Sequence, residues 1–325
     1  MPSRFRTDFI PSSIVPKLKP KSKILLLGSC FSDHIGRKLK ESKFKVLANP
    51  LGNIFNPISL AKIISHYLQG DKNIQVRDLW CKDGVISHKD FHSVHNSLDS
   101  LTYVRNIQSV LNVTRNQLSE SSHIILTFGS SWGYREKKSE EVVTNCHKMD
   151  PALFDKELFS VQQMALSLTP IFAMKKVNFI LTVSPVRHLK DGIIENMRSK
   201  ARLIELCHSL VDNNSNCSYF PAYELMIDDL RDYRFYKEDM IHPSSVAIDY
   251  IWDKFKQAIF SEEAEHFAIK NNKLNKAKRH RPFLTNSEVF RQFCIQQLEK
   301  IRKLESEYPY IDYQNETNYF TQYLK

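Results

Sequence analysis

The sequence changes abruptly from an apolar run to a helical pattern within residues 23–32, Lys-Ile-Leu-Leu-Leu-Gly-Ser-Cys-Phe-Ser. Four apolar residues in succession are typical of a strand that is buried on both faces, as in a parallel sheet. After Gly28 the apolar residues recur every fourth position, which predicts an amphipathic helix. Ser29 and Cys30 are therefore expected between a central strand and a helix N-terminus, where free backbone N–H groups favour a thiolate or an oxyanion.

Apolar and amphipathic segments alternate along the rest of the first 260 residues. The expected strands are 23–28, 44–48, 123–128, 177–183 and 217–222, and the expected helices after the first are 58–70, 101–120, 151–173, 197–211 and 246–260. Residues 71–100 have no clear period and are expected to be irregular. This alternation predicts an α/β domain with a mostly parallel sheet and helices on both faces. In such sheets, ligands bind outside the carboxyl ends of the strands.

The character of the sequence changes near Ser261, which suggests one domain over residues 1–260 and a second segment over 261–325. The second segment begins with the basic tract Lys270–Arg281, whose composition is typical of a solvated connector. Thr285 and Glu288 then have the spacing of a capping box, followed by a long amphipathic pattern. We therefore expect a basic linker and a helical C-terminal extension.

Composition narrows the class of protein. A hydrophobic fraction of 42% supports a sizeable core, and the formal charge of +10 raises nucleic acid as a partner, but nucleic acid is not favoured because the excess lies in local tracts. The six cysteines lack C-x-x-C spacing, which predicts free thiols in a reducing compartment and therefore a cytoplasmic protein. Met1–Arg6 does not resemble a signal peptide, and no segment approaches a membrane span. We expect no cofactor and no metal.

A second candidate for chemistry is Asp239-Met-Ile-His242. An aspartate three residues before a histidine can hold one ring nitrogen, and this leaves the other nitrogen free to take a proton from a nucleophile. The pair follows the last expected strand and precedes the last expected helix. That position places it at the same edge of the sheet as Ser29 and Cys30. The structural alternatives are a histidine that is merely held by Asp239 and a cysteine that is packed and inert.

Residues 28–32, Gly-Ser-Cys-Phe-Ser, resemble the N-terminal signature of the GSCFA proteins, a bacterial group placed within the SGNH/GDSL hydrolase superfamily. Residues 145–147, 184–188 and 230–236 also resemble segments of that family. The resemblance implies a three-layer, flavodoxin-like α/β/α fold and chemistry on acyl esters. The nucleophile of the superfamily matches Cys30, and its Asp-x-x-His pair matches Asp239 and His242. Ser29 is the rival nucleophile, with helix capping as its structural alternative.

The resemblance also indicates where an oxyanion would be held. The oxyanion glycine of the superfamily matches Gly52, which is otherwise a turn glycine. The usual Gly-x-Asn is replaced here by residues 129–131, Gly-Ser-Ser. Its amide donor is therefore missing, and either Ser131 or the nearby Asn53 is expected to substitute.

Several other polar residues are candidates for binding. Arg187 is suited to a substrate carboxylate or phosphate, with a surface salt bridge as the alternative. His188 is expected to line the pocket. Together with His92, Cys146 and His147 it is also the basis of an alternative metal site, although no two of them have the spacing of ligands carried on one helix.

The sequence therefore predicts an ester hydrolase or O-acyltransferase that acts through Cys30 or Ser29 on a small-molecule, glycan or lipid acyl ester. The alternative from a different class is a non-catalytic module with a degenerate SGNH site. Its basic tract would bind RNA or anionic ligands.

Overall fold

The computed structural model describes residues 9–70, 72–174, 176–280 and 282–324. The predictions made for Met1–Arg6 and for Arg281 lie outside the described residues. The central element is a five-stranded sheet in the order β10-β9-β5-β1-β2. All of its neighbouring strands are parallel. Its strands are β1 (Lys23–Gly28), β2 (Lys45–Ala48), β5 (His123–Phe128), β9 (Asn178–Val183) and β10 (Cys217–Tyr219).

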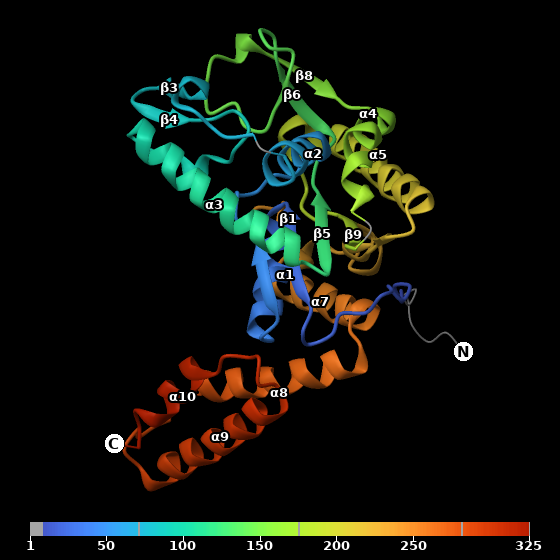
Figure 1. Cartoon of the computed structure of the whole chain (residues 1–325). Helices are drawn as coiled ribbons and strands as arrows, with labels where there is room; N and C mark the ends of the chain where they lie inside the picture. Colours follow the sequence, from blue (N-terminus) through green and yellow to red (C-terminus); the bar gives the residue numbers. More distant parts are fainter. Residues whose placement is uncertain (1–8, 71, 175, 281, 325) are drawn as a thin grey trace, which may run out of the picture.

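Helices cover both faces of this sheet (Figure 1). Alternate residues of β1 point to opposite cores, so that Leu25 and Leu27 join one apolar cluster while Ile24 and Leu26 join the other. This explains why the strand is apolar throughout, since neither face meets water. The first cluster involves α2 (Pro57–Lys62), α3 (Ser100–Glu120), α4 (Val161–Leu168) and α5 (Gly192–Asn213), and the second involves α1 (Cys30–Glu41), α6 (Ala222–Glu224) and α7 (Ser245–Ile259). The expected α/β architecture with a mostly parallel sheet is confirmed.

The direction of chain progression across the sheet reverses at β1, because β2 lies on one side of it and β5, β9 and β10 follow on the other. Such a reversal separates the loops at the carboxyl ends of neighbouring strands and leaves a crevice there. The turn after β1 contains Ser29 and Cys30. The topology therefore places Ser29 and Cys30 at the position where parallel sheets of this kind usually bind their ligands.

Two small antiparallel sheets were not predicted. The first is a hairpin of β3 (Trp80–Lys82) and β4 (Val85–Ser87), and its turn residues Asp83 and Gly84 both have positive φ. Asp-Gly is a strong hairpin signal, so the sequence did contain the information. The second consists of β6 (Trp132–Glu136), β7 (Val142–Val143) and β8 (Phe154–Leu158).

The helix predicted over residues 151–173 is wrong in its first part. Phe154–Leu158 is the strand β8. It pairs with β6, which lies about twenty positions earlier in the sequence. The following helix, α4, begins only at Val161, with Ser160 as its N-cap. Pairing with a distant strand decided the conformation of a segment whose local pattern was ambiguous.

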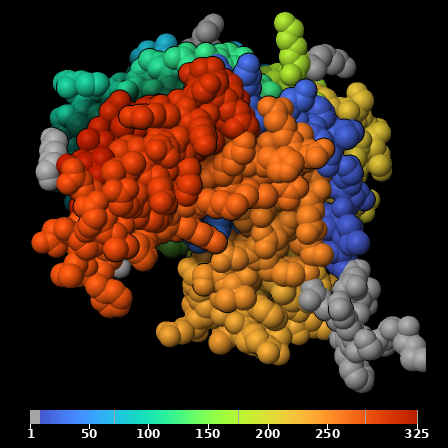
Figure 2. Space-filling model, turned by 90° about the horizontal axis from the view of Figure 1, so that it is seen from below, coloured from blue at the N-terminus to red at the C-terminus, as the bar shows by residue number. Residues whose placement is uncertain are grey.

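The C-terminal residues are helical, as expected, and comprise α8 (Glu262–Arg279), α9 (Glu288–Glu307) and α10 (Gln314–Thr321). The basic tract is not a connector, because its described residues continue α8 as far as Arg279. The predicted capping box is also wrong, since Ser287 rather than Thr285 caps α9. Figure 1 shows these helices below the sheet, and seen from below they cover one side of that end of the molecule (Figure 2).

The C-terminal helices contact the main domain through α1. Asn275 donates a hydrogen bond to the backbone oxygen of Glu41, and Arg279 pairs with the Glu41 carboxylate at 2.8 Å. Glu41 is the last residue of α1, whereas Cys30 is its first. Among the described residues, none of the helices combines the length and the apolarity that crossing a membrane requires.

Candidate active site

The turn after β1 is built around a glycine and a helix cap. Gly28 has φ +146° and a side chain there would meet the backbone oxygen of Thr127 at 2.3 Å, so only glycine fits without strain. Ser29 is the N-cap of α1, and its hydroxyl accepts a hydrogen bond from the Phe31 N–H at 3.3 Å. The same hydroxyl donates to Ser184 Oγ at 2.9 Å. Ser29 is therefore 2% exposed and fully engaged.

Cys30 differs from Ser29 in its environment. It is the first residue of α1, is half-buried, and has a free thiol. Burial raises the pKa of the Cys30 thiol, and the charge of Asp33 raises it further, whereas its own backbone N–H and the charges of Lys237 and Lys200 lower it. The resting side chain is consequently a thiol at neutral pH. It needs a base before it can act as a nucleophile.

The Asp239–His242 pair exists in the structure as a hydrogen bond of 2.7 Å between Asp239 Oδ2 and His242 Nδ1. Asp239 is itself held in position, because its other oxygen accepts the backbone N–H groups of Ile241 and His242, both at 2.9 Å. The bond from the His242 backbone N–H, followed by the bonds to the His242 ring and from the Ile241 N–H, lowers the pKa of Asp239. The carboxylate therefore stays ionised, and among the described residues no hydrogen bond occupies the other ring nitrogen of His242.

The loop that carries His242 is fixed to the loop after β9. The Arg187 backbone N–H donates to the Ile241 oxygen at 3.1 Å, and its guanidinium donates to the Met240 oxygen at 3.0 Å. That guanidinium also lies over the rings of Tyr236 and Tyr233, at 5.3 and 5.9 Å from their centroids. Arg187 therefore holds the His242 loop, and the surface salt bridge considered for it does not occur among the described residues.

The His242 ring contributes to the electrostatic environment of two other histidines, His34 on α1 and His188 after β9. Burial is the main cause of the lowered pKa of His34, which lies four residues after Cys30 on α1, followed by the charges of Arg37, Lys237 and His242. Burial also lowers the pKa of His188 to about 3, followed by the charges of Lys200 and His242. His188 is therefore neutral. Its ring lies against Phe55 at a centroid distance of 4.8 Å, and its buried Nε2 has no hydrogen-bond partner among the described residues.

The loop after β2 supplies the other side of the site. The Asn49 side chain accepts from the Gly28 N–H at 2.9 Å and donates to the Ser29 oxygen at 3.1 Å, to Asp33 Oδ1 at 3.0 Å and to Asn53 Oδ1 at 2.9 Å. The side-chain oxygen of Asn53 therefore faces Asn49. The amide N–H₂ group of Asn53 has no partner among the described residues. The N–H of Gly52 donates to the Asn49 oxygen at 2.9 Å and is occupied within the turn.

The polar groups of Ser131 are already engaged within the protein. Its hydroxyl and backbone N–H both contact Ser199 of α5, at 3.1 and 2.8 Å, and the residue is completely buried. Cys146 is half-buried with its pKa raised by burial, and His147 contacts the backbone oxygens of His88 and Phe91 through Nε2. Over the described ranges there is no cluster of three or more histidine, cysteine or acidic side chains that would suit a metal.

Comparison with known families agrees with the segments noted in the sequence. Residues 23–255 match the GSCFA family, and residues 271–325 match the C-terminal domain of GSCFA domain proteins. The chain belongs to the GSCFA family. No curated protein matches it.

In this GSCFA chain, sequence reasoning missed Lys200, which lies completely buried beneath the site. Its Nζ donates to the backbone oxygens of Gly129 and Ser184, both at 2.8 Å. Burial lowers the pKa of Lys200 to about 7, and the nearby Cys30 opposes this shift. Ser184 in turn contacts Ser29, so Lys200 joins the ends of β5 and β9 on one side of the turn that carries Ser29 and Cys30.

Lys200 was missed because the buried face of α5 differs from its apolar stripe. The helix expected over residues 197–211 begins earlier, at Gly192, and Met197 and Ala201 in the first turns of the expected helix are exposed. The buried face instead includes the polar residues Asn196, Ser199 and Lys200, which bond to the loops of the site. The sequence contained one signal for these contacts, since Asn196 and Lys200 each directly precede a residue of the apolar pattern.

Proposed function

We propose that the chain is an acyl-ester hydrolase or O-acyltransferase of the SGNH type, with Cys30 as nucleophile and His242 as its base. The observation that carries the proposal is the Asp239–His242 hydrogen bond at 2.7 Å. It leaves one ring nitrogen free, at the same sheet edge as a half-buried cysteine at a helix N-terminus. A nucleophile, a base and a group that orients the base form the arrangement used for covalent catalysis.

In this mechanism His242 Nε2 takes the proton of the Cys30 thiol as the sulfur attacks the ester carbonyl. A C–S bond forms and the carbonyl π electrons move to oxygen. Collapse of this intermediate breaks the C–O bond, and the departing alkoxide takes the proton from His242. Water or an acceptor hydroxyl then attacks the thioester with His242 again as base, which restores the thiol.

The backbone N–H of Cys30 and the free amide of Asn53 are the donors that we assign to the oxyanion. Asn53 is favoured over Ser131 because the Ser131 hydroxyl is already engaged with Ser199. The N–H of Gly52 is not assigned, because it is bound to Asn49. The positive end of the α1 dipole acts on the same oxygen.

Cys30 is preferred to Ser29 because the two side chains differ in their hydrogen bonds. The Ser29 hydroxyl accepts the capping bond from the Phe31 N–H and donates its proton to Ser184, so deprotonating it would remove the bond to Ser184, and attack on a substrate would compete with the cap. Within the part of the chain that the structure describes, the Cys30 thiol makes no comparable bond to another residue. A free thiol also fits a cytoplasmic enzyme, and all six cysteines are unpaired.

A hollow beside the His242 loop is suited to the acyl or alcohol part of a substrate. It has a volume of about 260 Å³ and is lined by Arg187, Tyr233 and Tyr236 together with apolar side chains of α5 and of the segment after α6. Its mixed lining suits a small organic group with a polar end. We assign the substrate class to acyl esters of small molecules, glycans or lipids.

The test is the intact mass of the protein after brief exposure to p-nitrophenyl acetate. One acetyl adduct is expected in the wild type and in Ser29→Ala, and none in Cys30→Ala. Cys81→Ala is the matched control, because Cys81 is an exposed cysteine whose loss should not matter. An adduct that persists in Cys30→Ala but disappears in Ser29→Ala would transfer the nucleophile to Ser29. Absence of any adduct, combined with salt-sensitive RNA binding, would contradict the enzyme and favour the binding module.

A further inference from the structure

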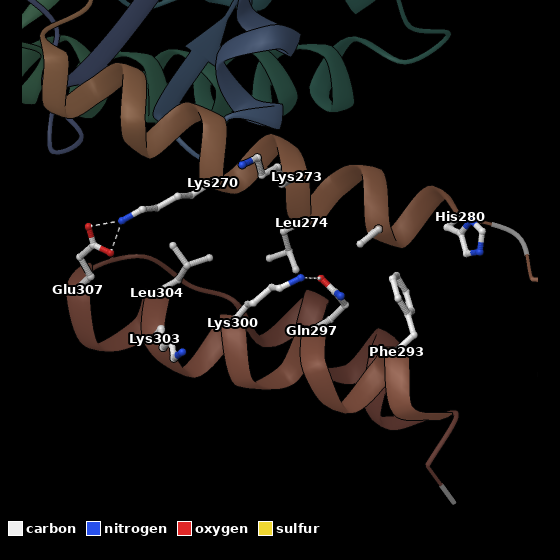
Figure 3. A pocket seen from close by; sticks show the side chains of 11 residues that line it. Lys270, Lys273, Leu274, His280, Phe293, Gln297, Lys300, Lys303, Leu304 and Glu307 are labelled. Atoms are coloured by element: carbon white, nitrogen blue, oxygen red, sulfur yellow. Dashed lines mark hydrogen bonds and ion pairs between the residues drawn. The ribbon is translucent and has the colours of Figure 1, made fainter. Parts of the chain in front are cut away.

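A groove runs between α8 and α9, at the end of α1 opposite Cys30 (Figure 3). Its volume is about 650 Å³, within the range of roughly 300–1,000 Å³ that small-molecule sites occupy. Because α1 has 12 residues, its two ends are separated by about 18 Å. The groove is therefore separate from the candidate active site.

The groove has an apolar floor. Leu274 and Leu304 are 3% and 6% exposed and form its base, and Ala277 and Phe293 extend it along the helices. Figure 3 shows Leu274, Leu304 and Phe293 between the two helices, with Lys270 reaching across to Glu307 at one end. An apolar floor of this kind favours a hydrocarbon ligand over a hydrated ion.

The two ends of the groove differ in charge. Lys270 pairs with Glu307 at 2.6 Å, whereas the His280 ring lies 5.7 Å from that of Phe293, so the helices are antiparallel and these pairs mark opposite ends. Lys270, Lys273 and Lys303 lie toward the Glu307 end, whereas Lys300 lies midway along the groove and its amine contacts Gln297; Glu307 is the acidic residue of the lining. The lysines are thus concentrated toward the Glu307 end of the groove, and the rings of His280 and Phe293 line the other end.

Two of these lysines are available to an anion. Lys270 is paired with Glu307, and Lys300 donates to Gln297 Oε1 at 3.4 Å. Lys273 and Lys303 are exposed, lie on the two facing helices, and have no ion pair or hydrogen bond among the described residues. Cations of this kind are expected to attract an anionic group at that end.

We propose that this groove binds a monomeric single-chain amphiphile with an anionic head, of the fatty-acid type. The carboxylate lies between Lys273 and Lys303, and the hydrocarbon chain lies over Leu274 and Leu304 toward Phe293. The polarity of the groove favours this ligand over an acidic partner helix, which would require cations along the whole length of the groove. The site is independent of the proposed ester chemistry.

The experiment is a calorimetric titration of the full chain with dodecanoate below its micelle concentration. Saturable binding of one molecule is expected. Dodecyltrimethylammonium should bind at least ten-fold more weakly because its head is positive, and acetate at least ten-fold more weakly because it lacks the hydrocarbon chain. The double variant Lys273→Glu/Lys303→Glu should weaken dodecanoate binding by at least ten-fold. The matched control Lys45→Glu/Lys138→Glu makes the same charge change at exposed lysines elsewhere and should alter the affinity less than two-fold.

A second variant tests the apolar end without changing charge. Ala277→Trp fills the groove beside Phe293 and should also weaken dodecanoate binding at least ten-fold, with an unchanged circular dichroism spectrum. Cys30→Ala should bind as the wild type does, which separates this site from a product bound at the active site. Equal binding of the cationic amphiphile, loss of binding in Cys30→Ala, or binding only to phosphatidylglycerol vesicles would each overturn the proposal.

Discussion

The two ends of the molecule hold their charged side chains in different ways. At the carboxyl edge of the sheet, Lys200 is completely buried and bonded to two backbone oxygens. In the C-terminal groove, Lys273 and Lys303 are exposed and unpaired among the described residues. Fixed groups of the first kind hold reacting atoms in place, whereas groups of the second kind attract an anion at long range and are screened by salt. The difference suggests chemistry at one end and reversible binding at the other.

The largest expected effect concerns the base. His242→Ala should lower the rate of acetylation of Cys30 by about 10²–10⁴-fold, because general base catalysis contributes that much. Its thermal unfolding should change little, since the His242 ring is partly exposed and, among the described residues, bonds only to Asp239. Stopped-flow release of p-nitrophenol measures the rate. Lys303→Glu serves as the control from the other end and should react normally, and a loss of less than ten-fold in His242→Ala would remove His242 from the mechanism.

The next effect tests how much strain the turn at Gly28, before Ser29 and Cys30, can relieve. Gly28→Ala should destabilise the protein by about 2–4 kcal/mol, because both the φ of +146° and the contact of 2.3 Å with the Thr127 oxygen are unfavourable for a side chain. Gly84→Ala is the matched control: φ is +75° there but nothing lies within 4 Å, so a cost of about 1 kcal/mol is expected. Urea unfolding measures both. Equal costs would mean that the turn relaxes easily.

Lys200 provides a test through pH. Its folded pKa of about 7 lies below the ordinary 10.5, so between these pH values the unfolded chain binds the proton and the folded chain does not. Folding stability should therefore rise as pH increases from 7 to 10, by up to about 1.4 kcal/mol per pH unit. Lys200→Met should lack this rise when unfolding is followed in urea at several pH values. Parallel curves for the two proteins would contradict a depressed pKa at Lys200.

The smallest effect concerns the thiol itself. Burial, followed by the charge of Asp33, raises the pKa of Cys30. Alkylation of Cys30 by iodoacetamide should therefore be slow at pH 7 and increase at alkaline pH, with exposed Cys81 reacting first. Asp33→Asn should shift the alkylation profile of Cys30 to lower pH, and peptide mass mapping separates the two cysteines. A shift to higher pH would show that Asp33 acts on the thiol through its bond to Asn49 rather than through its charge.

Much of the main domain was readable from the sequence because the signals are local. The strand His123–Phe128 was predicted without error, since its apolar run ends in turn residues on both sides. The Asp239–His242 bond was also predictable, because the two residues are three positions apart. The strand β8 and the buried face of α5 were not predicted, because each depends on partners that are distant in sequence.

By itself, the sequence determined the alternation of strands and helices, the glycine turn before Ser29 and Cys30, and the Asp239–His242 pair, because neighbouring residues specify each of them. Only the tertiary structure decided that Ser29 is engaged and Cys30 is free, that Asn49 joins Gly28 to Asn53, and that Lys200 lies beneath the site. The groove between α8 and α9 belongs to this second group. The physical reason is that burial and hydrogen-bond partners are properties of packed elements, which no local pattern specifies.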